Sequence, residues 1–230
     1  MRIDRLNLLT NDIAVQRTFY AEELPLPVLE ASGTVLSLQA GRSQLTFRQA
    51  PDGWIGFYHF AFNIPEDQFV EAKQWLSKRV TLIKDNNGKD EFPSSKEWNA
   101  HSVYFYDPAG NILEFIARHD LDEHLDRPFD AQNILSISEI GIVSEDVSGM
   151  VRSLQSQMEI RPYGGPASET FAAVGDEYGL FIVVKQGRIW FPDTGKQALP
   201  ASLGVEVTSD TGARYKLRYP PYEIDMFGAG

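Results

Sequence analysis

The chain of 230 residues contains no cysteine. Disulfide bonds, thiolate catalysis and cysteine-ligated zinc or iron–sulfur sites are therefore excluded. Histidine is also scarce, because the chain has only four, and all of them precede residue 125. A histidine-based metal site in the second half of the chain would therefore need help from the first half.

Long apolar runs and clusters of Lys and Arg are missing as well. The longest apolar runs are a few residues, far short of the roughly 20 needed to span a bilayer. Charged residues near Met1 interrupt what would have to be the apolar part of a signal peptide. The net charge of -11 disfavours binding to a phosphate backbone or to an anionic membrane surface. We therefore expect a cytoplasmic protein that binds neither nucleic acid nor a membrane.

The composition is that of a globular protein with real cores. Hydrophobic residues make up 43% of the chain and charged residues 23%, and the length suits two domains of ordinary size. Residues 119–132 contain five acidic residues among few apolar ones, and we interpret them as a linker. The sequence thus predicts an N-terminal domain over 1–118 that holds the site and a degenerate C-terminal domain over 133–230.

The same order of strand-like and helix-like periods recurs along the chain. Each segment opens with residues that alternate with a period of two, continues with helix-capping residues and a helical period, and closes with further strands. The opening strands are expected at residues 3–9, 57–63, 137–143 and 203–208. The last segment is shortened. This repeat predicts four related modules, and it is more informative than any single element.

The sharpest local signal is a hairpin whose turn is residues 107–110. Pro108 suits the second position of a type I turn, and Gly110 can supply the positive φ that follows. If this four-residue turn sets the register, Val103 lies opposite Glu114, and His101 shares the face of Glu114.

Residues 104–114, Tyr-Phe-Tyr-Asp-Pro-Ala-Gly-Asn-Ile-Leu-Glu, together with the repeated modules, resemble the vicinal oxygen chelate superfamily. That superfamily includes glyoxalase I, extradiol dioxygenases, fosfomycin-inactivating transferases and bleomycin-binding proteins. The resemblance implies an α+β fold. Paired βαβββ modules would form curled mixed sheets, shaped as a cup with the helices outside, in two domains.

The resemblance also implies a divalent metal in the cup, held by the first and last strands of the modules. It puts His59 and Glu114 at two ligand positions, and Glu114 is also the candidate catalytic base. His101 is the candidate third ligand. The cofactor is then one divalent metal, Fe, Mn or Zn, or none at all. The equivalent position of the third module falls on Glu139, which we interpret as a mark of lost chemistry or of support for a dimer.

In the first module the ligand positions fall on Arg5 and Thr46. An arginine has no lone pair to give to a metal. We expect Arg5 to lie near Glu114, where it either forms an ion pair or grips an acidic ligand bidentately. The candidate substrate-binding residues are Arg5, Asn7, Asn63, Trp98 and Tyr106.

Two functions from different classes follow. The first is a metal-dependent enzyme, dioxygenase- or glyoxalase-like, that acts on a small oxygenated molecule. The alternative is a non-catalytic small-molecule binding protein of the bleomycin-resistance kind, in which Arg5 replaces a metal ligand. A scaffold that forms a homodimer through its C-terminal region is a third hypothesis. The superfamily hosts unrelated reactions, so fold alone does not identify the substrate.

Overall fold

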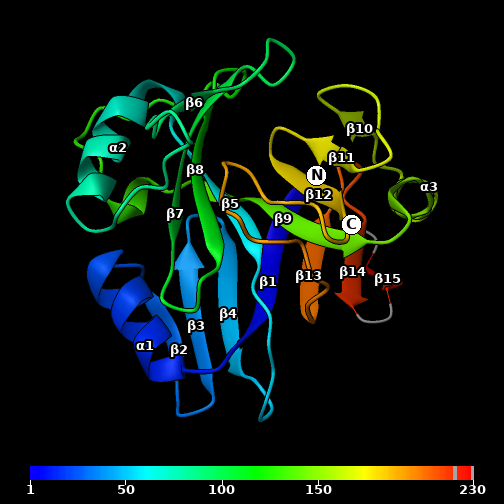
Figure 1. Cartoon of the computed structure of the whole chain (residues 1–230), viewed down its shortest axis with the longest axis horizontal. Helices are drawn as coiled ribbons and strands as arrows, with labels where there is room; N and C mark the ends of the chain where they lie inside the picture. Colours follow the sequence, from blue (N-terminus) through cyan, green and yellow to red (C-terminus); the bar gives the residue numbers. More distant parts are fainter. Residues whose placement is uncertain (220–221, 229–230) are drawn as a thin grey trace.

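The computed structural model describes residues 1–219 and 222–228. Its strands form two curled mixed sheets, one of seven strands and one of eight, and the larger is a half-barrel. In Figure 1 helices α1 and α2 flank one side of the molecule and α3 the other, so the helices lie outside the sheets. The expected α+β cup fold is confirmed.

The first module follows the predicted order. Asp12 caps the helix, because its Oδ1 accepts a hydrogen bond from the Val15 N–H at 3.0 Å. The helix continues as a wider π turn. The elements are β1 (Arg2–Thr10), α1 (Ile13–Arg17), η1 (Thr18–Glu23), β2 (Val28–Ala31), β3 (Val35–Ala40) and β4 (Ser43–Gln49).

The second and third modules repeat that order with one long helix each. The second consists of β5 (His59–Ile64), η2 (Glu66–Gln68), α2 (Phe69–Ser77), β6 (Phe92–Pro93), β7 (Ala100–Tyr106) and β8 (Ile112–Arg118). After η3 (Ala131–Asn133), the third consists of β9 (Ser136–Ser144), α3 (Val147–Met158), β10 (Pro162–Tyr163), β11 (Phe171–Asp176) and β12 (Gly179–Lys185).

The last module is shortened, as predicted. It has three antiparallel strands, β13 (Leu203–Thr208), β14 (Arg214–Tyr219) and β15 (Glu223–Gly228), and no helix among its described residues. Part of the expected final piece, residues 220 and 221, lies outside the described residues.

The modules pair across the predicted domain boundary, which corrects that prediction. The seven-stranded sheet has the order β15-β14-β13-β1-β4-β3-β2, so the first module joins the last. The eight-stranded sheet has the order β10-β11-β12-β9-β5-β8-β7-β6, so the second module joins the third. Residues 1–118 and 133–230 therefore do not form separate domains, and 119–132 connects two strands of one sheet. The acidic composition of residues 119–132 indicates that this segment is exposed. It does not indicate whether the segment separates two domains or connects two strands of one sheet.

The register of the hairpin also differs from the prediction. Glu114 lies opposite Tyr104, and Tyr106 lies opposite Ile112. Gly110, with a φ of 77°, adds one residue to the loop after the type I turn, as in a G1 bulge. A shift of one residue turns every side chain of the strand to the other face. His101 therefore lies on the face opposite to Glu114.

The turn of this hairpin is fastened to the first module by a buried carboxylate. Asp107 accepts hydrogen bonds from Gln16 Nε2 at 2.8 Å, Tyr20 Oη at 2.9 Å and Asn111 Nδ2 at 2.7 Å. Asn111 Oδ1 in turn accepts the Tyr58 N–H at 2.8 Å, immediately before β5. The turn thus fixes the starts of both β5 and β8.

One large apolar core joins the sheets and the helices. It contains residues of β1, β5 and β9 and of all three α-helices, for example Leu6, Phe60, Ile140, Leu76 and Leu154. A smaller cluster lines the concave face of the eight-stranded sheet. The concave face is thus partly apolar, but it also carries the polar groups described below.

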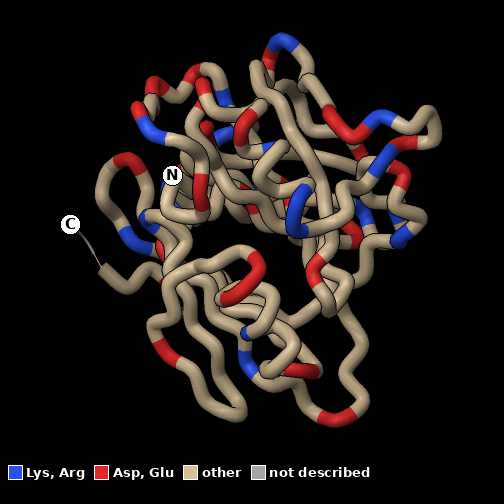
Figure 2. Tube along the Cα trace, turned by 90° about the vertical axis from the view of Figure 1, so that its left-hand side faces the viewer, with Lys and Arg blue, Asp and Glu red and all other residues tan. Residues whose placement is uncertain are grey.

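The charged residues are interspersed along the chain. Figure 2 shows Lys and Arg in short stretches that acidic and uncharged residues separate. None of the helices in residues 1–219 and 222–228 is long and apolar enough to cross a membrane.

We predict that residues 1–132 do not fold alone, because β1 would lose β13 and β5 would lose β9. The free strand edges and uncovered apolar residues should give a fragment without a cooperative urea transition, whereas the full chain should unfold cooperatively. Co-expressed fragments 1–125 and 126–230 should purify as a complex, since each sheet needs strands from both. A cooperative transition of fragment 1–132 by itself would contradict the module pairing.

Candidate metal centre

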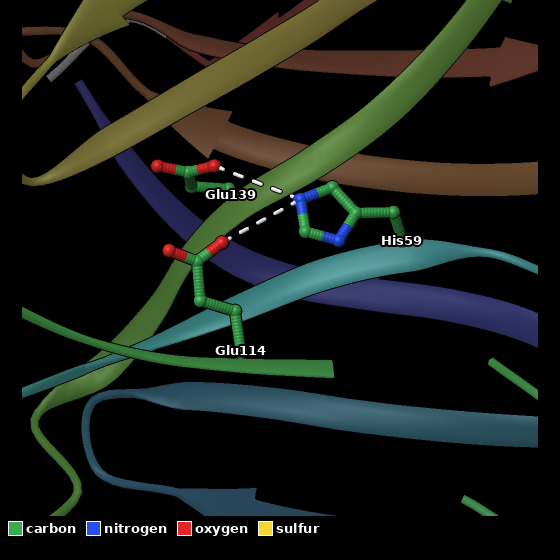
Figure 3. A group of neighbouring side chains, drawn as sticks. All are labelled: His59, Glu114 and Glu139. Carbon is green, nitrogen blue, oxygen red and sulfur yellow. Dashed lines mark ion pairs between the residues drawn. The ribbon is translucent and has the colours of Figure 1, made fainter. Parts of the chain in front are cut away.

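Three titratable side chains converge at the middle of the eight-stranded sheet (Figure 3). His59 comes from β5, Glu114 from β8 and Glu139 from β9, which are three neighbouring strands. All three residues are buried, with exposed fractions of 6%, 2% and 3%. Each offers a ligand atom, and these atoms all lie within 4.8 Å of one another.

The distances within this cluster suit an ion better than hydrogen bonds. His59 Nε2 lies 3.7 Å from Glu114 Oε2 and 3.8 Å from Glu139 Oε2. Both separations exceed hydrogen-bond length. Two ligand atoms that bond one metal at about 2.1 Å lie roughly 3.0–3.6 Å apart, so a small inward rotation of the carboxylates would close the site.

The His59 ring is held in the orientation that a metal ligand needs. Its Nδ1 lies 3.2 Å from the carbonyl oxygen of Ile112, to which the Nδ1–H donates, and this leaves the Nε2 lone pair facing the carboxylates. The ring neighbours those of Trp190 and Tyr104, whose centroids lie 5.1 Å and 6.3 Å from its own. A Cβ at Gly141 would come within 2.6 Å of the Trp190 ring. A residue with a side chain at this position would therefore displace the Trp190 ring from its contact with His59.

Glu139 is oriented by a buried arginine. Arg118 Nη2 donates to Glu139 Oε1, while Glu139 Oε2 faces His59. The guanidinium is fully buried, and its Cζ lies 5.6 Å from the Trp98 ring centroid and 5.5 Å from that of Tyr163. Arg118 therefore neutralises one carboxylate without blocking the oxygen that points into the centre.

The electrostatics favour protonation when no ion is present. Burial, followed by the charge of Glu139, raises the pKa of Glu114 to about 7. Burial by itself lowers the pKa of His59, but its interactions with Glu139 and Glu114 outweigh burial and raise it. Burial and the same carboxylates raise the pKa of Tyr104 far above its usual range, so this phenol stays protonated. The cluster thus has a deficit of positive charge that a proton or a divalent cation can fill.

The registers reveal a local two-fold relation between the second and third modules. In the antiparallel pair β5–β9, Phe60 lies opposite Ile140, and Ala61 lies opposite Glu139. A two-fold axis between Phe60 and Ile140 relates the residue before Phe60 to the residue before Ile140. Glu139 is therefore the counterpart of His59. Glu114 on β8 lies opposite Ala61, and Ile182 on β12 lies opposite Gly141, which the same axis relates to Ala61. Ile182 is thus the counterpart of Glu114. Ile182 therefore occupies the fourth position of the ring, and the centre has three polar corners and one apolar corner.

The predicted ligands are partly brought together. His59 and Glu114 meet as expected, and Glu139 joins them, although we had interpreted it as a mark of lost chemistry. His101 does not, because the register places it on the other face. There His101 Nδ1 lies 2.7 Å from His119 Nε2, and the His101 ring packs against Phe69.

The expected neighbourhood of Arg5 and Glu114 is wrong. Arg5, Asn7 and Thr46 lie in the seven-stranded sheet, where β1 pairs with β4 and β13. Arg5 is 56% exposed, and its Nε lies 3.8 Å from Glu206 Oε2. These residues line a separate polar cavity of about 760 Å³. The modules pair in an order that puts Arg5 and Glu114 into different cups.

The other predicted binding residues divide between the cavity and its surroundings. The metal cluster opens into a cavity of about 330 Å³, and Trp98 lines it. Asn63 lies on the face of His59, but its Nδ2 donates to the Glu177 carbonyl at 3.0 Å. Tyr106 lies outside this cavity, under Lys196, whose Nζ is 5.1 Å from the ring centroid.

Several residues of the site were not predicted from the sequence. Tyr104, Phe171, Trp190, Phe191 and Arg188 line the cavity together with the metal cluster. Only Tyr104 belongs to the recognised hairpin, and the correct register would have identified it. The others come from the third module and the loop after it, which the sequence did not place beside the second module.

The chain matches no protein-family model and no curated protein. Among solved structures, it is similar to a candidate dioxygenase from Bacillus subtilis, with 16% identity and a TM-score of 0.62 over 95% of this chain and 82% of that one. A glyoxalase/bleomycin resistance protein/dioxygenase from Alicyclobacillus acidocaldarius matches with 18% identity and a TM-score of 0.43 over 51% of this chain and 92% of that one.

A fosfomycin resistance protein from Listeria monocytogenes, complexed with Mn(II), matches with 17% identity and a TM-score of 0.39 over 51% of this chain and 90% of that one. At these identities the likeness concerns the fold. Over 95% of its length the chain shares the fold of the Bacillus subtilis protein, and this fold is the α+β cup that the sequence resemblance implies.

The metal-free protein should lose stability as pH rises. Glu114 is an acid whose folded pKa, about 7, lies above the roughly 4.3 of an exposed glutamate, so ionisation in the native state costs free energy between these values. His59 is a base whose pKa folding raises, so its contribution is lost as pH rises through that pKa. Both effects have the same sign.

Urea denaturation in the presence of a chelator, at several values between about pH 5 and pH 8, measures this loss. Glu114→Gln should flatten the dependence, whereas the exposed carboxylate variant Glu30→Gln should keep it. An equally steep dependence in Glu114→Gln would show that the buried carboxyl is not its source.

Proposed function

We propose that this protein is a divalent-metal-dependent enzyme that acts on a small oxygenated molecule in the cup of the eight-stranded sheet. His59, Glu114 and Glu139 would hold the ion. The observation that carries the proposal is the convergence of three buried ligand atoms, with the His59 ring already held through Nδ1. The mixed nitrogen and carboxylate donor set suits Mn²⁺, Fe²⁺ or Zn²⁺.

When bound, the ion would supply Lewis acidity toward two neighbouring oxygens of a substrate. The chain's own residues do the rest. Arg118 fixes Glu139, so that only one of its oxygens faces the substrate side. The aromatic rings of Trp98, Phe171 and Trp190 line the cavity and give it apolar walls against which a substrate can pack.

Proton transfer has two candidate groups in the same cavity. Glu114 has a pKa of about 7 in the cluster without an ion, so its carboxylate, when released from the ion, can take a proton from a bound molecule near neutral pH. Tyr104 keeps its proton and can donate a hydrogen bond to a developing oxyanion. This pairing supports dioxygenase- or glyoxalase-like chemistry, in which a substrate oxygen gains negative charge.

The second candidate function is metal-free binding of a small molecule, and the ion pair between Arg118 and Glu139 favours it. With His59 protonated, two buried cations balance two buried carboxylates without a metal. Arg118 then takes the part that the sequence interpretation had assigned to Arg5. The homodimer and the cytoplasmic location stay predictions.

Metal analysis of protein purified without chelators separates the two functions. We expect about one divalent ion per chain in wild type and none in the variant His59→Ala, Glu114→Ala. Metal-free wild type should rise in melting temperature when Mn²⁺, Fe²⁺ or Zn²⁺ is added, because the ion binds only the native state. Glu139→Gln should weaken the metal affinity by more than the roughly 10–100-fold typical of outer-shell changes.

The enzyme proposal fails if wild type carries no ion and none of the three metals raises its melting temperature. The variant Glu206→Gln provides a matched control, since Glu206 is a largely buried carboxylate of the other cup. Its metal content should equal that of wild type.

The two-fold relation makes a separate prediction. Ile182→His adds a donor at the fourth corner and should raise the Mn²⁺ or Zn²⁺ affinity by about tenfold or more, because each ligand adds a bond to the ion. Arg5→His places the same donor in the other cup, at the position equivalent to His59, and should leave this affinity unchanged. A larger effect of Arg5→His, measured by calorimetric titration, would contradict the assignment of the centre to the eight-stranded sheet.

A further inference from the structure

The cavity beside the metal cluster contains a cation that the proposed chemistry does not use. Arg188 lies in the loop after β12 and lines the same cavity as His59, Glu114 and Glu139. Its Cζ lies 5.2 Å from the ring centroid of Phe171, so its stem and guanidinium pack along an aromatic wall. The side chain is thus held at the cavity while its donors remain available.

Arg188 differs in this respect from Arg118. Arg118 is paired with Glu139. No carboxylate of residues 1–219 or 222–228 lies within ion-pair distance of Arg188, and burial alone lowers its pKa. A half-buried guanidinium with five donors and no anionic neighbour is suited to bind a carboxylate bidentately.

The charge balance of the cavity points the same way. In the metal-bound state the two carboxylates Glu114 and Glu139 equal the charge of a divalent ion, and Tyr104 stays neutral. Arg118 and Arg188 then leave the cavity with a net positive charge. A ligand with negative charge at both ends, one near the ion and one near Arg188, would match this distribution.

The size and lining of the cavity restrict the ligand further. A volume of about 330 Å³ lies at the lower end of the roughly 300–1,000 Å³ of small-molecule sites. The walls contain five aromatic rings, those of Trp98, Tyr104, Phe171, Trp190 and Phe191, and the hydroxyls of Ser94 and Ser95. Such walls favour a single planar ring over a flexible chain.

We infer that Arg188 forms a carboxylate subsite and that the substrate is a small aromatic acid, with its ring between the aromatic walls and its oxygens toward the metal cluster. This inference rests on the proposed function in taking the cavity as the substrate site and, for the charge balance, in taking the ion as bound. Arg188 then acts as a specificity-determining residue and not as a catalytic one.

Calorimetric titration with benzoate and benzamide tests the subsite. The two probes share the ring and differ in charge. The protein is kept metal-free with a chelator, so that Arg188 is the one lining cation of the described residues without a carboxylate partner. Wild type should bind benzoate about tenfold more tightly than benzamide, as expected for a charge-assisted pair at a half-exposed site.

The variants make the assignment specific to this side chain. Arg188→Met should remove the preference for benzoate and keep the affinity for benzamide, which also verifies that the cavity is intact. Arg188→Lys should keep part of the preference, because it retains the charge but not the planar fork. Arg48→Met, which removes a cation of the other cup, should behave as wild type. If Arg188→Met also loses benzamide, the comparison is made on Arg188→Gln.

Equal affinity of wild type for both probes, a preference that persists without Arg188, or no binding of either probe overturns the inference. The metal analysis is independent of these outcomes. Stoichiometric metal together with equal probe affinities defeats the subsite alone. An Arg188-dependent preference in a protein that binds no metal defeats the proposed enzyme function alone.

Discussion

The antiparallel pairing of β5 with β9 is the contact on which the rest of this structure depends. It joins the second module to the third, and it sets Phe60 opposite Ile140. A local two-fold axis between these two residues relates the strands and modules on either side of the pair. Because of that relation, Glu139 faces the same space as His59, and the strands on either side bring Glu114 and Ile182 to the remaining corners. The first and last modules then pair through β1 and β13 in the other sheet.

Bringing two carboxylates into one buried space has a large electrostatic cost. Like charges about 4 Å apart repel by roughly 4 kcal/mol at an effective dielectric constant of 20, and burial adds the loss of hydration. The ion pair between Arg118 and Glu139 offsets part of this electrostatic cost. The remaining cost is reflected in the raised pKa of Glu114. A proton on Glu114 or His59, or a divalent ion between them, can supply the missing charge. The same imbalance therefore gives the cluster its affinity for cations and its sensitivity to pH.

Much of the fold was predictable from the sequence, because strand alternation, helix caps and the Asp-Pro-Ala-Gly turn are local signals. His59 and Glu114 were predictable for the same reason, since both belong to segments that resemble a known superfamily. The partners of the modules were not, because nothing local distinguishes a β5–β9 pair from a β1–β5 pair. One bulged residue at Gly110 was enough to reverse the face of His101. Glu139, Arg188 and Trp190 depend on the module pairing and could not be assigned without it.

The two cups of the molecule show why only one of them forms a centre. In the seven-stranded sheet the positions equivalent to the ligands are Arg5 and Thr46, and cations pair with exposed acids, for example Arg218 with Asp225, which are 51% and 56% exposed. Such pairs remain hydrated and contribute little energy. In the eight-stranded sheet, fewer charged residues line the cavity, but His59, Glu114 and Glu139 are buried beside aromatic rings, so an unpaired charge there is a stronger binding group. Burial by Trp190, Trp98 and their neighbours, more than the number of polar residues, turns one concave sheet face into a site.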